Sequence, residues 1–239
     1  MRVKKKVLLL GPAYPYRGGI ADTQNYLAQN LSRLGHEVLV YTFKYQYPKL
    51  LFPGKTQYSS VPMPKGIDIK RKIHSINPIN WIKISNEINH YDPDIVLFRY
   101  WTPFLAPCWI WIAKRLSSKI KKIALVDNWI PHDKKPWDKT MNDLFGKTMD
   151  AFVTLSNAVA KEIMEDKPKT PIWSGFHPIA DDLPKIISKA VARKKLGWSK
   201  EKNIVLFFGL IRKYKGLDLL IEAEHGSDSS VYLITLQVL

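Results

Sequence analysis

The chain has 239 residues, of which 46% are hydrophobic, so it can bury at least one substantial core and is not expected to be disordered. Its single cysteine, Cys108, excludes a disulfide framework and a cysteine-based zinc site. A formal net charge of +16 indicates a negative partner: a nucleic acid, an anionic membrane or a phosphorylated substrate. No zinc-finger spacing, aromatic RNA-binding motif or basic tail is present, which disfavours nucleic acid.

The N-terminal region predicts neither a signal peptide nor a membrane-spanning helix. The first apolar run covers only Val7 to Leu10, and no small-residue cleavage site follows it. The most apolar window, Phe98 to Ala113, contains Arg99 and two prolines and is shorter than the roughly 20 residues that cross a bilayer. We therefore expect a cytoplasmic protein that could lie peripherally at the inner face of the membrane.

The first 42 residues predict one βαβ unit. Val3 to Leu10 is a strand candidate, and a loop of Gly, Pro and Tyr residues ends in Gly18-Gly19 directly before a helix. That helix places Ile20, Leu27, Leu31 and Leu34 on one face and should end at Gly35. His36 to Thr42 reads as the next strand, which predicts a right-handed crossover and a parallel sheet.

The rest of the chain continues the alternation of strands and helices. Between Thr42 and Ile79 the pattern is replaced by aromatic residues, prolines and basic residues, which predicts a long loop. The alternation predicts a doubly wound α/β fold. Strands are expected at 95–98, 120–126, 151–155 and 204–208, and helices at 79–88, 104–116, 137–147, 157–164 and 188–196.

A change of composition between Pro168 and Pro184 marks a candidate hinge between two domains, 1–180 and 181–239. After it we expect a strand up to Phe208, a helix from Leu217 to Ala223 and a last apolar stretch from Val231 to Leu239. Two strands and one helix cannot cover both faces of a parallel sheet, so the second domain is expected to be incomplete.

Two glycine-bearing loops could bind phosphate. Glycines at 18 and 19 would let a phosphate or sugar approach the positive end of the helix, although a plain tight turn is an equally good reading. The segment G-L-I-R-K-Y-K-G from Gly209 places Arg212 and Lys215 after a strand, where two cations could neutralise a diphosphate. Solvated surface charge is the alternative there.

Two further segments follow strand ends and carry polar or aromatic groups. The stretch from Val126 gathers Asp127, Asn128 and His132, which could supply a base or merely form hydrogen bonds within a loop. The segment R-Y-W-T-P-F from Arg99 could stack a sugar or lipid on Tyr100 and Trp101, but burial of these aromatics in the core is favoured.

The order of these segments resembles the family 4 ("group 1") glycosyltransferases of the GT-B fold. The family opens with a strand, a loop ending in G-G, a helix and G-H-E-V-x-V-x-T, and this chain has V-L-L-L-G-P-A-Y-P-Y-R-G-G followed by L-G-H-E-V-L-V-Y-T. Some members carry W-x-P-F-x-A-P and N-x-x-P-H-E, read here as W-T-P-F-L-A-P and N-W-I-P-H-D. F-F-G-L-I-R-K-Y-K-G-L-D-L-L-I-E-A, from Phe207, is similar to the start of the family's donor domain.

The resemblance implies two Rossmann-like domains that face each other across a cleft, and a role for each matched residue. Gly18 and Gly19 would lie near the donor phosphates, and Lys215, with Arg212 less securely matched, would hold the diphosphate. Many members have a His where this chain has Asp127, so the family's imidazole is absent or replaced, and His132 is only its neighbour. We therefore expect Asp127 and His132 as catalytic candidates. The acceptor side would comprise Arg99, Tyr100, Trp101 and Asn128.

The resemblance further implies transfer of a sugar from a nucleotide diphosphate sugar to a glycan or lipid-linked acceptor, with retention and without a metal or other cofactor. The family's pair of glutamates seven positions apart is missing here, and no Glu follows Glu224. We therefore expect a chain truncated within its donor domain, with little or no activity of its own.

The alternative is a non-catalytic module that docks on anionic membrane through Lys114, Arg115, Lys119, Lys121, Lys122 and the aromatic loop 43–64. Nucleic-acid binding ranks last.

Overall fold

The structure is a computed structural model that describes residues 3–47, 57–59, 62–131, 133–167, 169–177, 184–201, 203–209, 211, 213–225 and 231–236. The chain divides into two compact units, unit 1 (Met1–Ile179) and unit 2 (Ala180–Leu239).

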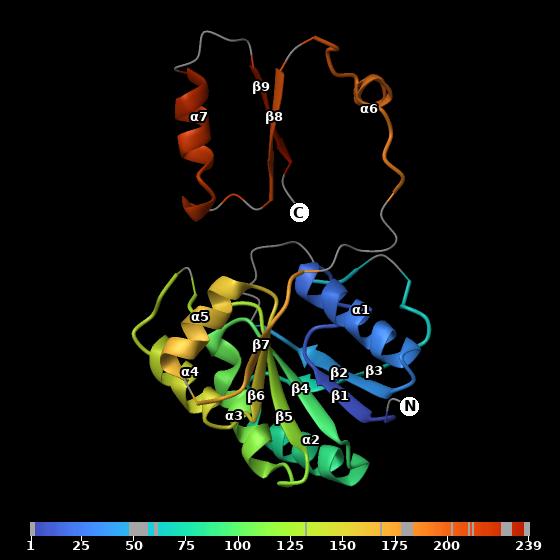
Figure 1. Ribbon diagram of the computed structural model, residues 1–239, viewed down its shortest axis with the longest axis vertical. Helices are drawn as coiled ribbons and strands as arrows, with labels where there is room; N and C mark the ends of the chain where they lie inside the picture. Colours follow the sequence, from blue (N-terminus) through green and yellow to red (C-terminus); the bar gives the residue numbers. More distant parts are fainter. Residues whose placement is uncertain are drawn as a thin grey trace. The chain divides into compact units, whose positions relative to one another are not determined.

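Unit 1 is built on a seven-stranded parallel sheet (Figure 1). The strand order is β3-β2-β1-β4-β5-β6-β7. The strands are β1 (Lys6–Leu10), β2 (Glu37–Tyr45), β3 (Asp68–His74), β4 (Ile95–Tyr100), β5 (Lys121–Val126), β6 (Ala151–Thr154) and β7 (Ile172–Ser174). Because the order reverses between β1 and β4, the carboxyl ends of these two strands form the switch point at which open α/β sheets bind ligands.

Among the described residues, five α-helices and a short 3₁₀ turn connect these strands. They are α1 (Gly19–Arg33), α2 (Pro78–Tyr91), η2 (Pro103–Leu105), α3 (Ala106–Arg115), α4 (Asp138–Gly146) and α5 (Asn157–Asp166). Local sequence sets several helix starts: the side chain of Asn77 accepts hydrogen bonds from the backbone amides of Ile79 and Asn80, and that of Ser156 accepts one from Ala158. The expected alternation of strands and helices is thus confirmed for this unit.

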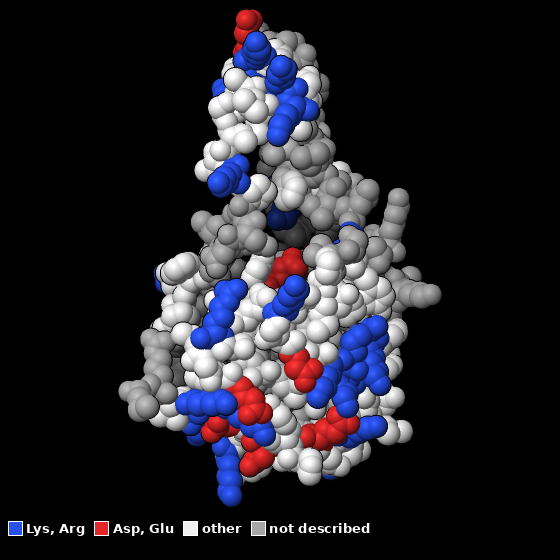
Figure 2. Space-filling model, turned by 90° about the vertical axis from the view of Figure 1, so that its right-hand side faces the viewer, with Lys and Arg blue, Asp and Glu red and all other residues white. Residues whose placement is uncertain are grey.

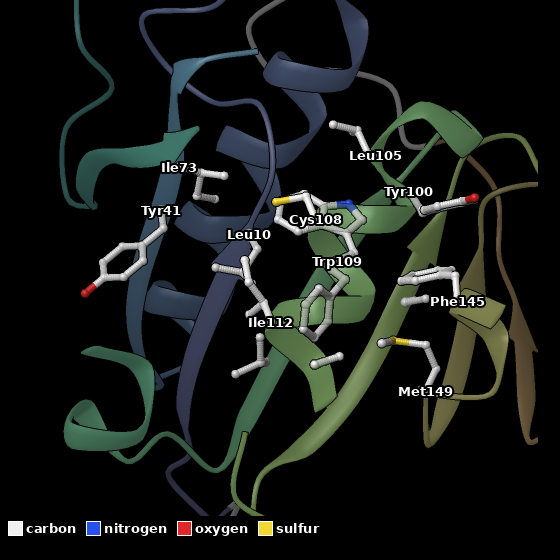
Figure 3. Close-up of a cluster of buried hydrophobic side chains, with 14 of the residues drawn as sticks. Leu10, Tyr41, Ile73, Tyr100, Leu105, Cys108, Trp109, Ile112, Phe145 and Met149 are labelled. Atoms are coloured by element: carbon white, nitrogen blue, oxygen red, sulfur yellow. The ribbon is translucent and has the colours of Figure 1, made fainter. Parts of the chain in front are cut away.

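More helices pack on one face of the sheet than on the other, and the side chains of β1 point alternately to the two faces. Leu8 and Leu10 point into the larger buried cluster, which includes residues of α2 to α5. Val7 and Leu9 point to the opposite face, where they pack with Ala28 of α1. Figure 3 shows the larger cluster, in which aromatic side chains are prominent; those that it labels are Tyr41, Tyr100, Trp109 and Phe145.

Two strands lie where the sequence predicted irregular structure. The expected loop from Thr42 to Ile79 contains β3, an edge strand, and the expected hinge after Pro168 contains β7, at the other edge. Both are hard to recognise from sequence, since β3 reads D-I-K-R-K-I-H with three exposed charged residues and β7 has only three residues. The two expectations are therefore wrong in these parts.

The expected buried face of α1 is confirmed in part. Leu27 and Leu31 pack half-buried against the smaller cluster, whereas Leu34 ends the helix and is 52% exposed. The fully buried residues of the helix are Ala21, Gln24, Asn25 and Ala28. Small side chains at 21 and 28 allow the helix to approach the sheet closely, which a pattern based on large apolar residues does not detect.

Unit 2 contains α6 (Lys189–Leu196), β8 (Asn203–Phe208), the 3₁₀ turn η3 (Lys213–Lys215), α7 (Leu217–His225) and β9 (Val231–Leu236). Strands β8 and β9 pair in parallel and α7 connects them, so the expected strand, helix and strand are confirmed. Apolar side chains of β8 remain open to solvent, with Leu206 49% and Phe208 67% exposed. No helix within the described part of the chain has the length and apolar character needed to cross a membrane.

Candidate functional site

A pocket of about 210 Å³ lies at the carboxyl ends of β1, β2 and β4, at the switch point of the sheet. It brings together three residues that the sequence predicted to bind ligand from separate segments, namely Gly18, Gly19 and Trp101. The other lining residues are Pro12, Tyr16, Arg17, Ile20, Ala21, Gln46, Tyr47 and Gln57.

The glycine pair leaves the start of α1 open. Gly18 has φ 107°, a backbone conformation that side chains disfavour, and no side chain caps the helix after it. A Cβ atom added to Gly18 or to Gly19 would meet nothing within 4 Å. The backbone amides of the first helical turn, at the positive end of the helix dipole, are therefore not screened by side chains at these positions, as in sites that bind phosphate.

Aromatic residues form a second wall of the pocket. The Trp101 Nε1 donates a hydrogen bond to the Tyr47 hydroxyl at 2.7 Å, which fixes the two rings at an interplanar angle of 85°. The ring of Phe104 packs on Tyr47 with centroids 5.5 Å apart. Burial raises the pKa of Tyr47 to about 12, so its hydroxyl stays neutral at physiological pH. A sugar ring can pack against such a half-buried aromatic surface.

A short segment, 57–59, is held against the loop that precedes the glycine pair. Arg17 donates its backbone amide to the Gln57 carbonyl at 3.0 Å, and Ser59 donates to the Pro15 carbonyl at 2.7 Å. The Tyr58 hydroxyl accepts a hydrogen bond from the Arg71 guanidinium at 3.0 Å. This segment therefore completes the third side of the pocket and brings Gln57 to its lining.

The predicted residues Arg99 and Asp127 form a buried ion pair beside the switch point. The Arg99 side chain is 1% exposed and that of Asp127 is 8% exposed. Arg99 donates to both carboxylate oxygens, from Nε at 2.6 Å and from Nη2 at 2.5 Å, and Nη2 also donates to the Thr23 hydroxyl at 2.9 Å. This bidentate geometry ties the end of β4 to the residue after β5 and to α1.

Tyr100 lies in the core, which confirms the reading that the sequence favoured for this residue and contradicts the acceptor-side position that the resemblance implied. It is fully buried, its ring stacks on Phe145 with centroids 4.2 Å apart, and its hydroxyl donates to the Asn142 side chain at 2.6 Å (Figure 3). Successive side chains of a strand point to opposite faces of the sheet. Tyr100 therefore faces the helix layer, whereas its neighbour Trp101 faces the pocket.

Four predicted residues remain, Asn128 and His132 in unit 1 and Arg212 and Lys215 in unit 2. Asn128 is exposed after β5, and His132 lies outside the described residues. In unit 2, Lys215 ends η3 with its side chain exposed, directly before Gly216 at φ 68°, whereas Arg212 is outside the described residues.

The sequence did not single out Arg17, Gln46 or Gln57 as lining residues. They come from two loops, and only the pairing of 57–59 with the glycine loop brings them to one place. No spacing rule connects positions 17 and 57, so no signal in the sequence could have found this contact.

A larger open groove of about 680 Å³ lies at the opposite end of the sheet, near the starts of β2 and β3 and the end of α2. Its acidic side chains already have basic partners, as in Asp68 with Lys70 at 3.2 Å and Glu87 with Lys72 at 3.0 Å. This groove is far from the carboxyl ends of the strands, where open α/β sheets bind ligands. The pocket of about 210 Å³ is therefore the better candidate, although it is the smaller of the two.

Solved structures share this fold. Sucrose-phosphate synthase from Thermosynechococcus elongatus aligns with a TM-score of 0.69 at 11% identity over 97% of this chain. Anabaena HepE in complex with UDP and glucose aligns with a TM-score of 0.68 at 13% identity over 98%. The catalytic domain of starch synthase IV from Arabidopsis thaliana, bound to ADP and acarbose, aligns with a TM-score of 0.60 at 14% identity over 99%.

This chain spans 62% of the length of each of the first two structures and 69% of the third. No curated protein sequence matches it significantly. The expected GT-B-type α/β architecture, with Rossmann-like parallel sheets, is confirmed by these neighbours. The sequence profile of Glycosyltransferase Family 4 matches residues 17–173, which contain the glycine pair, the aromatic wall and the Arg99–Asp127 pair, and the chain therefore belongs to Glycosyltransferase Family 4.

Proposed function

We propose that the protein transfers a sugar from a nucleotide diphosphate sugar to a glycan or lipid-linked acceptor, in the synthesis of a cell-surface polysaccharide or glycolipid. The observation that carries the proposal is the pocket at the switch point, where the uncapped start of α1 and an aromatic wall meet. The first suits the phosphates of a donor and the second suits a sugar ring.

Family membership and the fold support this reading. Two of the neighbouring structures hold bound nucleotides, UDP in HepE and ADP in starch synthase IV. A nucleotide diphosphate carries the negative charge that a chain of net charge +16 attracts. In the proposal, Lys215 supplies a cation for a donor diphosphate, and no metal is required.

The structure suggests a positioning role for Asp127 in this reaction. Its carboxylate is engaged by Arg99 through two short hydrogen bonds, so it holds the end of β4 in place next to the pocket. In this arrangement Trp101, two residues after Arg99, is kept in the pocket wall. A free general base would instead need an oxygen open to the acceptor hydroxyl.

We further propose that the 239-residue chain alone turns over weakly or not at all. The described part of unit 2 offers a two-stranded sheet with exposed apolar side chains, which is a poor platform for half of a donor site. Incubation with UDP-glucose and ADP-glucose, followed by mass spectrometry of the released nucleotide, tests this point. Rapid donor hydrolysis or transfer would contradict it.

Donor binding is tested by titrating the chain with UDP and ADP in a calorimeter and comparing two variants at one position. Gly19→Asp places a carboxylate at the first turn of α1, where the space is open and Asp is favourable for the helix. Gly19→Asn has the same size without the charge. We expect Gly19→Asp to weaken nucleotide binding by about tenfold relative to Gly19→Asn, since a like charge then faces the phosphates.

Equal affinities of the two variants would contradict phosphate binding at the start of α1. Trp101→Ala should weaken binding of the sugar-bearing donor or of an acceptor, and Trp111→Ala is its matched control because Trp111 lies on α3 outside the pocket. An unchanged affinity of Trp101→Ala for every sugar ligand would remove the aromatic wall from the site.

A further inference from the structure

The outward faces of α2 and α3 combine exposed large apolar residues with basic ones. Residues Ile79, Lys83 and Asn86 recur at the three- and four-residue spacing that defines one stripe of α2, and all three are exposed. Ile79 is 79% exposed, and Ile76, just before the helix, is 49% exposed. On α3 the matching stripe carries Trp111, which is 42% exposed, followed by Lys114 and Arg115.

The two stripes belong to one surface because the helices pack side by side. The Asn89 side chain donates to the Arg115 carbonyl at 2.9 Å, and the rings of Trp81 and Trp111 lie 6.3 Å apart between centroids. Lys119, exposed in the turn after α3, extends this surface. We refer to Ile76, Ile79, Lys83, Trp111, Lys114, Arg115 and Lys119 together as the α2–α3 surface.

All four charged residues of the α2–α3 surface are basic, and the exposed Asp92 at the end of α2 lies at its border. From the start of α3 through Lys122 the sequence contains no Asp or Glu. The acidic residue of α2, Glu87, is half-buried and its carboxylate is paired with Lys72 of β3, away from α3. Elsewhere on unit 1 the signs are mixed: on the side that bears α1, β2 and β3, Figure 2 shows acidic and basic side chains next to each other.

Helix electrostatics explains only part of this surface. Lysine and arginine in the last turn of α3 complement the helix dipole, as they do in many helices. The dipole gives no reason for an isoleucine to be 79% exposed beside a second exposed isoleucine, or for a tryptophan on the middle of the same helix pair to be 42% exposed. Apolar and basic groups on one face are what interfacial membrane-binding helices share.

We propose that the α2–α3 surface docks on a bilayer that contains anionic lipid. Ile76, Ile79 and Trp111 enter the headgroup region, and Lys83, Lys114, Arg115 and Lys119 contact the anionic headgroups. Lys114, Arg115 and Lys119 also belong to the membrane contact expected from the sequence, whereas Ile76, Ile79, Lys83 and Trp111 take the place of the 43–64 loop, much of which lies outside the described residues. Ile76 follows the carboxyl end of β3 and Lys119 comes just before the start of β5, so the surface runs along the helix layer from the carboxyl-end edge of the parallel sheet to its amino-end edge.

A nucleic acid fits this surface less well than a bilayer does. Phosphate contacts would use the four basic residues but would leave Ile76 and Ile79 without a function, because aliphatic side chains contribute little to backbone binding. The inference stands apart from the proposed donor site, since vesicle binding and nucleotide binding are measured independently and either can fail alone.

The test measures co-sedimentation of the 239-residue chain with vesicles of phosphatidylcholine containing 30% phosphatidylglycerol, a composition chosen at about the anionic content of a biological leaflet. Vesicles of phosphatidylcholine alone and a salt series are run in parallel. We expect binding to the anionic vesicles that weakens as salt is raised and weak binding to the neutral ones. Absence of binding to anionic vesicles at low salt would overturn the proposal.

Two charge variants locate the surface. Replacing Lys83, Lys114, Arg115 and Lys119 by Gln should weaken vesicle binding by several hundredfold, at about fivefold for each basic residue. The matched control replaces the exposed Lys65, Lys161, Lys169 and Lys195 by Gln and should bind within about tenfold of the native chain, through the longer-range field alone. Equal losses in the two variants would show unspecific attraction and overturn the proposal.

A third variant, Ile76→Ser with Ile79→Ser, tests insertion without changing the charge. We expect about tenfold weaker binding at high salt, where the apolar contribution dominates. Binding equal to that of the native chain would exclude insertion of these side chains. A circular dichroism spectrum and UDP binding equal to those of the native chain show that a variant is folded, so that its weaker vesicle binding is a docking defect. A DNA duplex is tested in place of the vesicles as the competing partner.

Discussion

The Arg99–Asp127 pair gives the sharpest test of how unit 1 is held together. In the variant Asp127→Ala the guanidinium keeps its hydrogen bond to Thr23 but loses two short charge-assisted ones, at 2.6 and 2.5 Å. Each is worth about 1.5–3 kcal/mol, and removal of one partner of a buried pair typically costs about 3–5 kcal/mol because the other charge stays buried. With the Asp127 side chain 8% exposed, some water reaches it, so we expect the lower half of that range.

Urea unfolding followed by circular dichroism and tryptophan fluorescence measures this loss. A matched control is Asp68→Ala, which breaks the exposed pair with Lys70 and should cost about 1 kcal/mol or less. The double variant Arg99→Met with Asp127→Leu should recover much of the stability, since no charge is then left buried.

The reasoning would be refuted if Asp127→Ala lowered the free energy of unfolding by less than about 1 kcal/mol. It would also be refuted if the loss of stability in the double variant equalled the sum of the losses in Arg99→Met and Asp127→Leu alone. Such an outcome would remove the positioning role and return Asp127 to its expected role of catalytic base. A large loss of stability with donor binding retained after refolding supports the positioning role.

Three further variants test the assignments made above. Tyr100→Phe leaves the buried Asn142 oxygen without its donor and should cost about 1–3 kcal/mol in urea unfolding while leaving ligand binding unchanged; a large loss of binding would restore Tyr100 to the site. Gly11→Ala would bring a Cβ atom within 2.6 Å of the Arg99 Cβ at φ 157°, so we expect destabilisation by about 1–3 kcal/mol, and native stability would disprove the close approach. Hydrogen bonds from two lysines lower the pKa of Asp143 to about 2, so its advantage over Asp143→Asn in thermal unfolding should be present above about pH 4 and disappear as the pH falls toward 2; a constant difference over that range would contradict the ion pairs.

Much of the fold could be predicted because strand and helix periodicities are local. The continuous apolar run of β1 and the capped start of α2 can be read within ten residues of sequence. The edge strands β3 and β7 could not, because a strand at the edge of a sheet is solvated on one side and loses the apolar pattern. Their identity as strands follows from pairing with β2 and β6, which is a tertiary contact.

For the site, the sequence by itself determined the glycine pair before α1, the aromatic segment after β4 and the order of motifs that points to the family. Only the tertiary structure decided that Tyr100 faces the core while Trp101 faces the pocket, and that Asp127 is bound to Arg99. The reason is physical. A residue type and its spacing state which chemistry is available, but its use depends on burial and on partners that lie 28 residues away in the sequence for Arg99 and 54 for Trp101.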